Sequence, residues 1–332
     1  MSGKILQEVV KSLLAEGRGI LAADESTGTI GNRFGAIGVN NTEENRRAYR
    51  ELFFTASGME KYISGVIMYD ETIRQATTKG IDFVELLSKK GVVPGIKVDE
   101  GTEEMDNSPL EKVTKGLDGL EKRLREYYEL GARFAKWRAV IVIGKDIPTA
   151  KCLQLNAERL ARYARLCQDN NLVPIVEPEV LMAGYHTIEQ CYEVTRKVLT
   201  AVFIQLKKEK VDLSSMLLKP NMVIYSLAGP KVDAGQVAEN TLKCLSSVVP
   251  PEVPGIVFLS GGQSEEEACK NLDVINKIAK NAPWKLSFSY GRALQNSTLK
   301  AWGGKEENIS VAQEVFVTRA KAASLAAQGK LE

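Results

Sequence analysis

The chain has 332 residues, and its 44 Lys and Arg nearly balance 42 Asp and Glu, so the formal net charge at pH 7 is +2. This length fits two or three average domains, or one large α/β barrel of roughly 250 residues with insertions. A hydrophobic share of 44% and a charged share of 26% exclude extensive disorder. The balanced charge argues against nucleic acid or an anionic membrane as main partner, because both need a dominant basic patch.

The cysteines and the single histidine limit the possible metal and redox chemistry. Five cysteines are scattered along the chain without a C-x-x-C pair, which argues against a disulfide framework and a thiolate zinc site and favours a reducing compartment. His186 lies in the turn-like stretch 184–187, and a histidine metal site needs two or three imidazoles. We therefore expect no metal, and we expect His186 to be a solvated loop residue.

The chain shows no sign of membrane attachment or of division into domains. Residues 1–10 are typical of a helix start rather than a signal peptide, and no apolar run approaches the ~18 residues of a membrane span. No Pro-, Ser- or Gly-rich linker interrupts the sequence. We expect a cytosolic protein with one domain over 1–332, built of an N-terminal helix at about 3–16, a barrel at about 17–300 and a C-terminal helix at about 305–328.

Short apolar runs recur along the chain, and each ends in a charged or glycine-containing step. In chain order they are 19–24, 63–70, 93–99, 133–138, 173–177, 215–219, 255–260 and 285–291. Helix-like patterns such as 156–167 lie between them, and Ser264–Glu267 forms a capping box that opens another helix. Alternating strands and helices predict parallel pairing through right-handed crossovers. Eight such units in one uninterrupted domain predict an α/β fold of the closed (β/α)8 TIM barrel type.

A doubly wound open sheet is the alternative fold. Its usual ligand signature is weak here, because the glycines of Gly17-x-Gly19-x-x-Ala22 precede the predicted strand instead of following it.

Charged residues two positions apart stand where several predicted strands end. The pairs are Lys97/Asp99, Lys136/Arg138 and Glu177/Glu179. Strand side chains alternate, and the C-terminal ends of TIM-barrel strands face the active site, so these pairs would share one pocket mouth with Asp24 and Lys219. The alternative is that these charged side chains are exposed to solvent and form no site, as most Lys and Glu side chains are. Recurrence on several strands favours a site.

Lys219 is the candidate nucleophile. It follows an apolar strand and precedes Pro220. Burial and a nearby second ammonium, for which Lys136 is the candidate, both favour the neutral amine, which is the form that attacks a carbonyl to give a Schiff base. Glu177 and Asp24 supply carboxyl groups for the proton transfers. The iminium itself is the electron sink, so this chemistry needs neither metal nor cofactor.

Two glycine-bearing segments predict a phosphate site. Leu259-Ser260-Gly261-Gly262 follows the seventh run, and Ser289-Tyr290-Gly291-Arg292 follows the eighth. Loops after strands seven and eight form the usual phosphate site of these barrels, where glycine lets backbone N–H groups approach the anion and arginine adds a forked charge. The segment Ser26-Thr27-Gly28-Thr29 offers hydroxyls for a second anion, although such runs also cap helices.

Six motifs in the same order resemble those of class I fructose-1,6-bisphosphate aldolase. They are Leu21–Gly28, Phe134–Arg138, Ile175–Glu179, Leu217–Met222, Phe258–Ser264 and Ser287–Leu294. The resemblance extends from about residue 17 to Lys330. It implies reversible cleavage of fructose 1,6-bisphosphate to dihydroxyacetone phosphate and glyceraldehyde 3-phosphate in glycolysis and gluconeogenesis, by a homotetramer without a metal.

The matching positions also imply roles for single residues. Lys219 would be the Schiff-base lysine, and Glu177 the main general acid/base. Asp24 would deprotonate the hydroxyl whose proton loss breaks the C3–C4 bond. Lys136 would assist electrostatically, and Glu179 would support the network.

The same resemblance assigns the two phosphates of the substrate. The C1 phosphate would be held by Ser260, Gly261, Gly291 and Arg292, with Leu259 and Ser289 beside them. The distal phosphate would be held by Ser26, Thr29, Lys97, Arg138 and Arg33.

The sequence departs from the family pattern in two places. The family usually carries a Lys-Arg pair where this chain has Asn32-Arg33, so one positive charge is missing near the distal phosphate. Family members also usually continue past residues 328–330 into a mobile tail that ends in a tyrosine, whereas this sequence ends at Glu332. Either the protein lacks this tail or the given sequence omits it. In a protein without the tail, we expect protonation of the enamine to be the step most affected, while carbon–carbon cleavage could continue.

Two other functions stay open on the sequence alone. One is a phosphosugar isomerase or epimerase that uses carboxylates without a covalent lysine, and Lys219 in its apolar frame argues against it. The other is a scaffold that binds actin or another acidic partner, as aldolases do as a family. Because a basic pocket mouth suits an acidic peptide, such binding would be an addition to catalysis.

Overall fold

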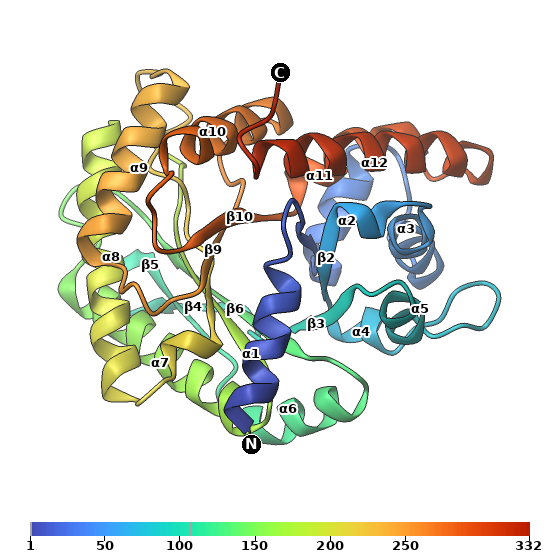
Figure 1. Cartoon of the computed structure of the whole chain (residues 1–332), viewed down its shortest axis with the longest axis horizontal. Coiled ribbons are helices and arrows are strands. Elements are labelled where there is room, and N and C mark those ends of the chain that lie inside the picture. Colours follow the sequence, from blue (N-terminus) through green and yellow to red (C-terminus); the bar gives the residue numbers. More distant parts are fainter. Residues whose placement is uncertain (1, 107) are drawn as a thin grey trace.

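Eight parallel strands close into a barrel in the computed structural model, which describes residues 2–106 and 108–332 (Figure 1). The strands are β1 (Gly19–Ala23), β2 (Ile63–Met68), β3 (Val93–Lys97), β6 (Phe134–Ile141), β7 (Val173–Val180), β8 (Leu217–Leu218), β9 (Gly255–Phe258) and β10 (Lys285–Tyr290). Around the barrel their order is β1-β10-β9-β8-β7-β6-β3-β2. The pairs Ile20–Ser289 and Leu21–Tyr290 join the first strand to the last. The predicted TIM barrel is confirmed, and closure excludes the open sheet.

Helices connect the strands and form the outer layer (Figure 1). They are α2 (Thr27–Gly35), α3 (Glu43–Thr55), α4 (Asp70–Ile73), α5 (Phe83–Lys89), α6 (Leu120–Glu129), α7 (Ala150–Asp169), α8 (Ile188–Lys208), α9 (Ala234–Val248), α10 (Glu265–Ile278) and α11 (Arg292–Trp302), with short 3-10 turns at Met59–Lys61, Leu213–Ser215 and Glu306–Asn308. The predicted capping box at Ser264 opens α10, and similar boxes at Thr187 and Asp233 open α8 and α9. These caps satisfy backbone N–H groups that a helix start leaves unpaired.

Successive side chains of each strand point alternately into the barrel and toward the helices, so the protein has two apolar cores. On β6, Phe134 belongs to the cluster inside the barrel, whereas Trp137 packs outward against the helix layer. Lys136 lies two residues after Phe134 and therefore points inward above it. On β7, Ile175 likewise precedes Glu177 on the inner face. The apolar lower layers of the barrel thus determine which strand-end side chains reach its mouth.

Helix α1 (Ser2–Leu13) closes the opposite, N-terminal end of the barrel. Its Leu6, Val10 and Leu13 belong to the inner cluster, together with Leu14. Gly255 leaves room for Leu14, because a Cβ there would lie 2.4 Å from the leucine side chain. The end opposite the strand C-termini is therefore filled with hydrocarbon.

Both terminal helices are shorter than predicted. The N-terminal helix ends at Leu13 instead of about 16, since Gly17 turns the chain with a φ of +66°. The C-terminal helix α12 covers Ile309–Ala326 and begins only after a 3-10 turn. It lies against α11 along one side of the molecule (Figure 1).

An antiparallel hairpin that the sequence analysis did not predict follows β3. It consists of β4 (Thr102–Met105) and β5 (Ser108–Thr114). Glu111, which is 1% exposed, accepts a hydrogen bond from the backbone N–H of Thr149 at 2.6 Å, at the start of α7. The amide nitrogen of Asn156 donates to the carbonyl of Lys112 at 2.9 Å. These bonds fix the hairpin beside the mouth of the barrel.

The prediction of a solvated His186 was wrong, because its ring is fully buried. Two loops pair around it: the His186 N–H donates to Ser226 Oγ at 2.9 Å, and the Leu227 N–H donates to the carbonyl of Met182 at 2.9 Å. Burial lowers the pKa of His186. A turn-like local sequence therefore misled the prediction, since the partner loop lies 40 residues away.

The five cysteines are free and buried. Within the described ranges, every helix is too short or too polar to cross a bilayer.

Candidate active site

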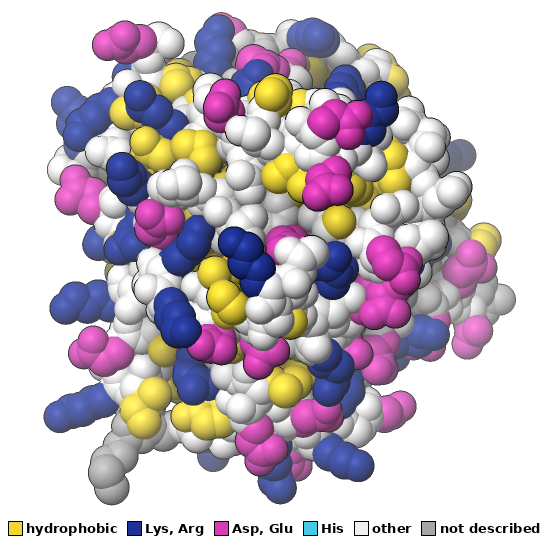
Figure 2. Space-filling model, turned by 90° about the vertical axis from the view of Figure 1, so that its right-hand side faces the viewer, with side chains coloured by type: hydrophobic (Ala, Val, Ile, Leu, Met, Phe, Trp, Pro, Cys, Tyr) yellow, Lys and Arg dark blue, Asp and Glu magenta, His cyan; other side chains and the backbone are white. Residues whose placement is uncertain are grey.

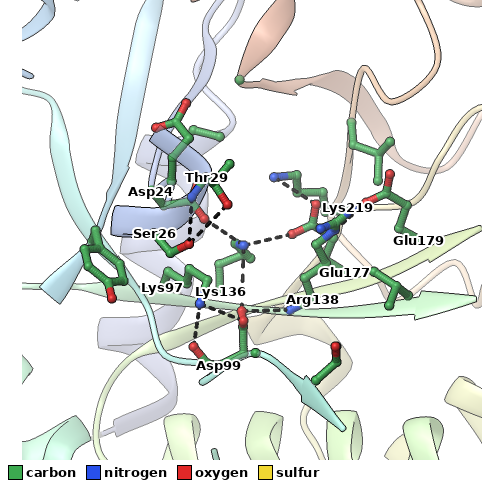
Figure 3. A pocket seen from close by; sticks show the side chains of 18 of the residues that line it. Asp24, Ser26, Thr29, Lys97, Asp99, Lys136, Arg138, Glu177, Glu179 and Lys219 are labelled. Carbon is green, nitrogen blue, oxygen red and sulfur yellow. Dashed lines mark hydrogen bonds and ion pairs between the residues drawn. The ribbon is translucent and has the colours of Figure 1, made fainter. Parts of the chain in front are cut away.

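A cavity of about 1400 Å³ opens at the C-terminal ends of the barrel strands. The sequence-predicted residues that line it are Asp24, Ser26, Thr29, Arg33, Lys97, Lys136, Arg138, Glu177, Glu179, Lys219, Leu259, Ser260, Gly261, Ser289, Gly291 and Arg292. These are all of the predicted site residues, and the barrel brings them together from the ends of seven strands and the segments that follow them. Figure 3 shows several of them, among them Asp24, Lys136, Glu177 and Lys219.

The ammonium of Lys136 is the centre of the polar contacts. Its Nζ lies 2.7 Å from Asp24 Oδ2, 3.3 Å from Glu177 Oε2 and 3.8 Å from Asp99 Oδ2 (Figure 3). Burial lowers the pKa of Lys136, but the carboxylates of Asp24 and Glu177 outweigh burial and raise it above the ordinary value. Lys136 is therefore a fixed positive charge within reach of three carboxylates.

Lys219 extends from the end of β8 and is 3% exposed. Its Nζ lies 3.2 Å from Glu177 Oε1, so the two oxygens of Glu177 contact two different lysines. An amine attacks a carbonyl only in its neutral form, and Glu177 lies within reach to accept a proton from Lys219.

Asp24 stays ionised in spite of its burial. Burial raises the pKa of Asp24, but the ammonium groups of Lys136 and Lys219 outweigh it and hold this pKa well below the ordinary value. At neutral pH the side chain is a carboxylate that can accept a proton from a substrate hydroxyl.

Two more ion pairs line the wall beyond Lys136. Arg138 Nε donates to Glu179 Oε2 at 2.5 Å, and Lys97 Nζ lies 2.7 Å from Asp99 Oδ1. Both cations line the cavity. The side chain of Arg138 is 42% exposed and so remains accessible to an anion, whereas that of Lys97 is 15% exposed.

Glycine-bearing backbone and one arginine line the neighbouring wall of the cavity. Gly291 precedes Arg292, the first residue of α11, so the positive end of the helix dipole faces this corner. A Cβ at Gly261 would lie 2.6 Å from Glu179 Oε1, which explains the glycine. Among the described residues, no carboxylate lies within ion-pair distance of Arg292, so its charge is available to a ligand.

The corner after β1 holds a second group of hydroxyls and a cation. Ser26 caps α2 by accepting the Thr29 N–H at 3.4 Å, and their two hydroxyls lie 3.1 Å apart. Arg33 Nη1 lies 2.5 Å from Glu25 Oε1. The capping role that the sequence allowed for this segment is present, and the hydroxyls still line the cavity.

Several lining residues escaped the sequence analysis. Glu25, Asp70, Arg74, Arg123 and Tyr127 also line the cavity. Arg123 and Tyr127 lie on α6 and Arg74 follows α4, where no strand-end position marks them. Glu25 follows Asp24, and Asp70 ends the apolar run 63–70, but neither was assigned to the site. Asp99 was visible in a charged pair, but its contact with Lys136 was not.

Among the described residues, no group of three or more His, Cys, Asp or Glu could hold a metal ion. The cavity holds a buried lysine, a second lysine between carboxylates, and two corners that carry arginines, hydroxyls or glycines. These groups suit imine formation and proton transfer on a substrate with an anion at each end.

Comparison with known proteins identifies the family. The profile of the family described as "Fructose-bisphosphate aldolase class-I" matches residues 5–332. The chain belongs to the class I fructose-bisphosphate aldolase family. It is 55% identical to cytosolic fructose-bisphosphate aldolase 5 of Arabidopsis thaliana, over 99% of this chain and 92% of that protein. It is 52% identical to a probable class 1 aldolase of Xanthomonas campestris, over 99% of both chains.

A solved structure agrees over the whole fold. The fructose-bisphosphate aldolase of Plasmodium falciparum, crystallised with TRAP and a small-molecule inhibitor, superimposes with a TM-score of 0.98 at 50% identity and covers 100% of this chain and 96% of its own. The function predicted from the sequence is thereby confirmed: the chain is a lyase of glycolysis that acts on a phosphosugar. The Arabidopsis relative is named cytosolic, in agreement with the predicted location.

Proposed function

We propose that this cavity is where fructose 1,6-bisphosphate is cleaved, with Lys219 as the Schiff-base residue. The observation that carries the proposal is the continuous set of contacts Lys219–Glu177–Lys136–Asp24. It joins a nucleophile, a proton carrier, a fixed cation and an ionised base in a buried site. The matching positions of the family motifs support the same roles.

The first steps form the imine. Glu177 takes the proton of the Lys219 ammonium, and the free amine attacks the C2 carbonyl to give a carbinolamine. Glu177 then returns a proton to the departing hydroxyl, which leaves as water and produces an iminium. Lys136 stabilises the negative charge of Glu177 whenever that carboxyl is ionised. Glu179, held by Arg138, supports the neighbouring wall.

Bond cleavage then uses Asp24. Its carboxylate accepts the proton of the C4 hydroxyl, the C3–C4 bond breaks, and the electron pair moves to the iminium, which becomes an enamine. Glyceraldehyde 3-phosphate leaves. Protonation of the enamine at C3 and hydrolysis of the imine release dihydroxyacetone phosphate and restore the Lys219 amine.

The two anion corners position the phosphates in this proposal. The C1 phosphate is held by Ser260, Gly261, Gly291 and Arg292, with Leu259 and Ser289 beside it. The distal phosphate is held by Ser26, Thr29, Arg33, Lys97 and Arg138. A bisphosphate spanning these corners places its carbonyl beside Lys219, at the bottom of the cavity between them.

Borohydride trapping tests the covalent step. The protein is incubated with dihydroxyacetone phosphate and EDTA, reduced with borohydride and mapped by peptide mass spectrometry. We expect one substrate-dependent adduct on Lys219, lost in Lys219→Met and kept in Lys285→Met, whose ammonium binds the Leu14 carbonyl instead. An adduct spread over surface lysines, or none, would contradict the imine mechanism and favour the isomerase alternative.

We also propose that the cavity mouth binds an acidic peptide, such as a segment of actin. The supporting features are the exposed Arg138 and Arg292, which has no ion pair with any described carboxylate, and the Plasmodium relative was crystallised with TRAP. Fructose 1,6-bisphosphate should displace such a peptide in fluorescence anisotropy. Persistent binding at saturating substrate would place the peptide elsewhere.

A further inference from the structure

Among the residues that the structure describes, the partners of the Arg33 guanidinium all bind one of its nitrogens. Nη1 donates to Glu25 Oε1 at 2.5 Å and to Gln295 Oε1 at 3.0 Å. No other nitrogen of Arg33 has a hydrogen bond to the residues that the structure describes. The side chain is 18% exposed and lines the cavity, so the rest of the guanidinium is available to a ligand.

Gln295 is fully buried on α11 and makes three hydrogen bonds. Its Nε2 donates to the Ala22 carbonyl at 2.6 Å, and its Oε1 accepts from Arg33 Nη1 and from the Tyr49 hydroxyl, the latter at 3.2 Å. A backbone carbonyl only accepts hydrogen bonds, so the amide nitrogen must face Ala22. The amide oxygen is thereby directed toward Arg33.

Arg33 needs such a restraint for two reasons. The charge of Arg292 repels it, and the carboxylate of Glu25 is shared between Arg33 and Arg50. Burial and then the nearby charge of Arg33 lower the pKa of Arg292, so two guanidinium groups occupy one corner. Glu25 cannot neutralise Arg33 alone, since its other oxygen lies 2.7 Å from Arg50 Nη1. Without another partner, a flexible arginine would turn away from Arg292.

We propose that Gln295 is a positioning residue that holds Arg33 toward the distal phosphate. It links Arg33 to Ala22, two residues before Asp24, and lies one helical turn after Arg292 on the same helix. The inference rests on the proposed function, in which Arg33 contacts that phosphate. Gln295 touches no substrate, since it does not line the cavity.

The test compares KM and kcat of Gln295→Met for two substrates. Methionine keeps the length of glutamine and removes all three hydrogen bonds. For fructose 1,6-bisphosphate we expect KM to rise about tenfold or more, as loss of a hydrogen bond to a charged group predicts, with kcat changed less than about twofold. For fructose 1-phosphate, which lacks the distal phosphate, KM should stay within about twofold.

A double-mutant cycle separates this inference from the function on which it rests. Arg33→Ala should raise KM for the bisphosphate, and adding Gln295→Met to it should raise KM no further. If Arg33→Ala leaves KM unchanged, the phosphate assignment fails. If Arg33→Ala raises KM but Gln295→Met does not, or if the two effects simply add, the positioning role of Gln295 is overturned.

Three further variants exclude a loss of packing as the cause. Gln313→Met makes the same substitution at a glutamine that binds the Leu52 carbonyl and Thr55, and it should leave both KM values unchanged. Tyr49→Phe removes only the tyrosine bond, with the same expectation. Should Gln295→Met fail to fold, Gln295→Asn keeps a polar amide whose oxygen stops short of Arg33, and it should raise KM for the bisphosphate alone.

Discussion

Asp24 and Lys136 show how single residues in this site depend on each other's charge. Asp24 is ionised because lysines surround it, and Lys136 is charged because carboxylates surround it. Removing either member leaves the other buried with one partner fewer, which is costly in a low-dielectric interior. The catalytic roles proposed for these residues therefore cannot be separated from their mutual support.

Asp24→Asn should slow cleavage strongly while leaving imine formation in place. An amide cannot accept the proton of the C4 hydroxyl, so kcat should fall by about 10²–10⁴-fold, the usual contribution of a general base. Borohydride should still trap dihydroxyacetone phosphate on Lys219. Asp70→Asn is the matched control, because Asp70 lines the same cavity but binds Arg74 and Tyr127. Wild-type kcat in Asp24→Asn would refute the assigned role.

The same carboxylate makes stability depend on acid pH. Because the pKa of Asp24 is lower in the folded state than its ordinary value, the ionised group stabilises the fold above about pH 4, the value of an unfolded aspartate. That contribution is lost as pH falls through the folded-state pKa. The difference in Tm between wild type and Asp24→Asn should be constant from about pH 5 to 8 and should shrink below about pH 4. A difference that grows in acid would have the wrong sign.

Asn32→Lys should restore the charge that the family pattern carries beside Arg33. Asn32 lines the cavity, and an ammonium there attracts the distal phosphate through a partly solvated gap. We expect KM for fructose 1,6-bisphosphate to fall about two- to fivefold, in line with about 0.5–1 kcal/mol for a partly exposed ion pair, and to depend more steeply on salt. Fructose 1-phosphate is the control substrate. An equal gain for both substrates would argue against a distal phosphate in this corner.

At the scale of secondary-structure elements, substitutions in α1 should change stability without changing activity. It fills the N-terminal end of the barrel, whereas the cavity opens at the other end. Leu13→Ala should lower the free energy of unfolding by about 2–5 kcal/mol, because Leu13 is fully buried and leaves a cavity. Ile5→Ala, on the same helix but 45% exposed, should cost less than about 0.5 kcal/mol. Urea unfolding measures both, and a changed KM in Leu13→Ala would contradict the separation.

The sequence predicted the barrel strands and the site residues at their C-terminal ends. Strand-end residues such as Lys136 and Lys219 could be found because their positions follow from apolar runs of fixed period. The hairpin clamped by Glu111 could not be found, because its partner Thr149 is 38 residues away. The proposed role of Gln295 could not be predicted for the same reason. No local sequence pattern marks a glutamine within a helix as a positioning residue, and its hydrogen-bond partner Ala22 is 273 residues away.

At the scale of the whole molecule, we consider the distribution of charge on one face. On the face drawn in Figure 2, basic and acidic side chains are interspersed, which agrees with the net charge of +2. This face offers no extended field of one sign to a nucleic acid or an anionic membrane.

We propose that the chain assembles into a homotetramer, as the resemblance to the family implies. Light scattering coupled to size exclusion should give four times the chain mass of 36.5 kDa. The measurement should be repeated at several protein concentrations, since weak oligomers dissociate on dilution. A single-chain mass at micromolar concentration would overturn the tetramer and leave the lyase unaffected.

The alternating direction of the side chains along β7 limits which insertions and deletions the gene can tolerate. Glu177 and Glu179 reach the cavity because Ile175 packs inside the barrel on the same face. Deleting a single codon early in this strand would move Pro178 and Val180 into the places of Glu177 and Glu179 and turn both carboxylates toward the helix layer. We therefore expect insertions and deletions of residues to be tolerated in the connecting loops. In the strands we expect substitutions to be tolerated, but not the insertion or deletion of a residue.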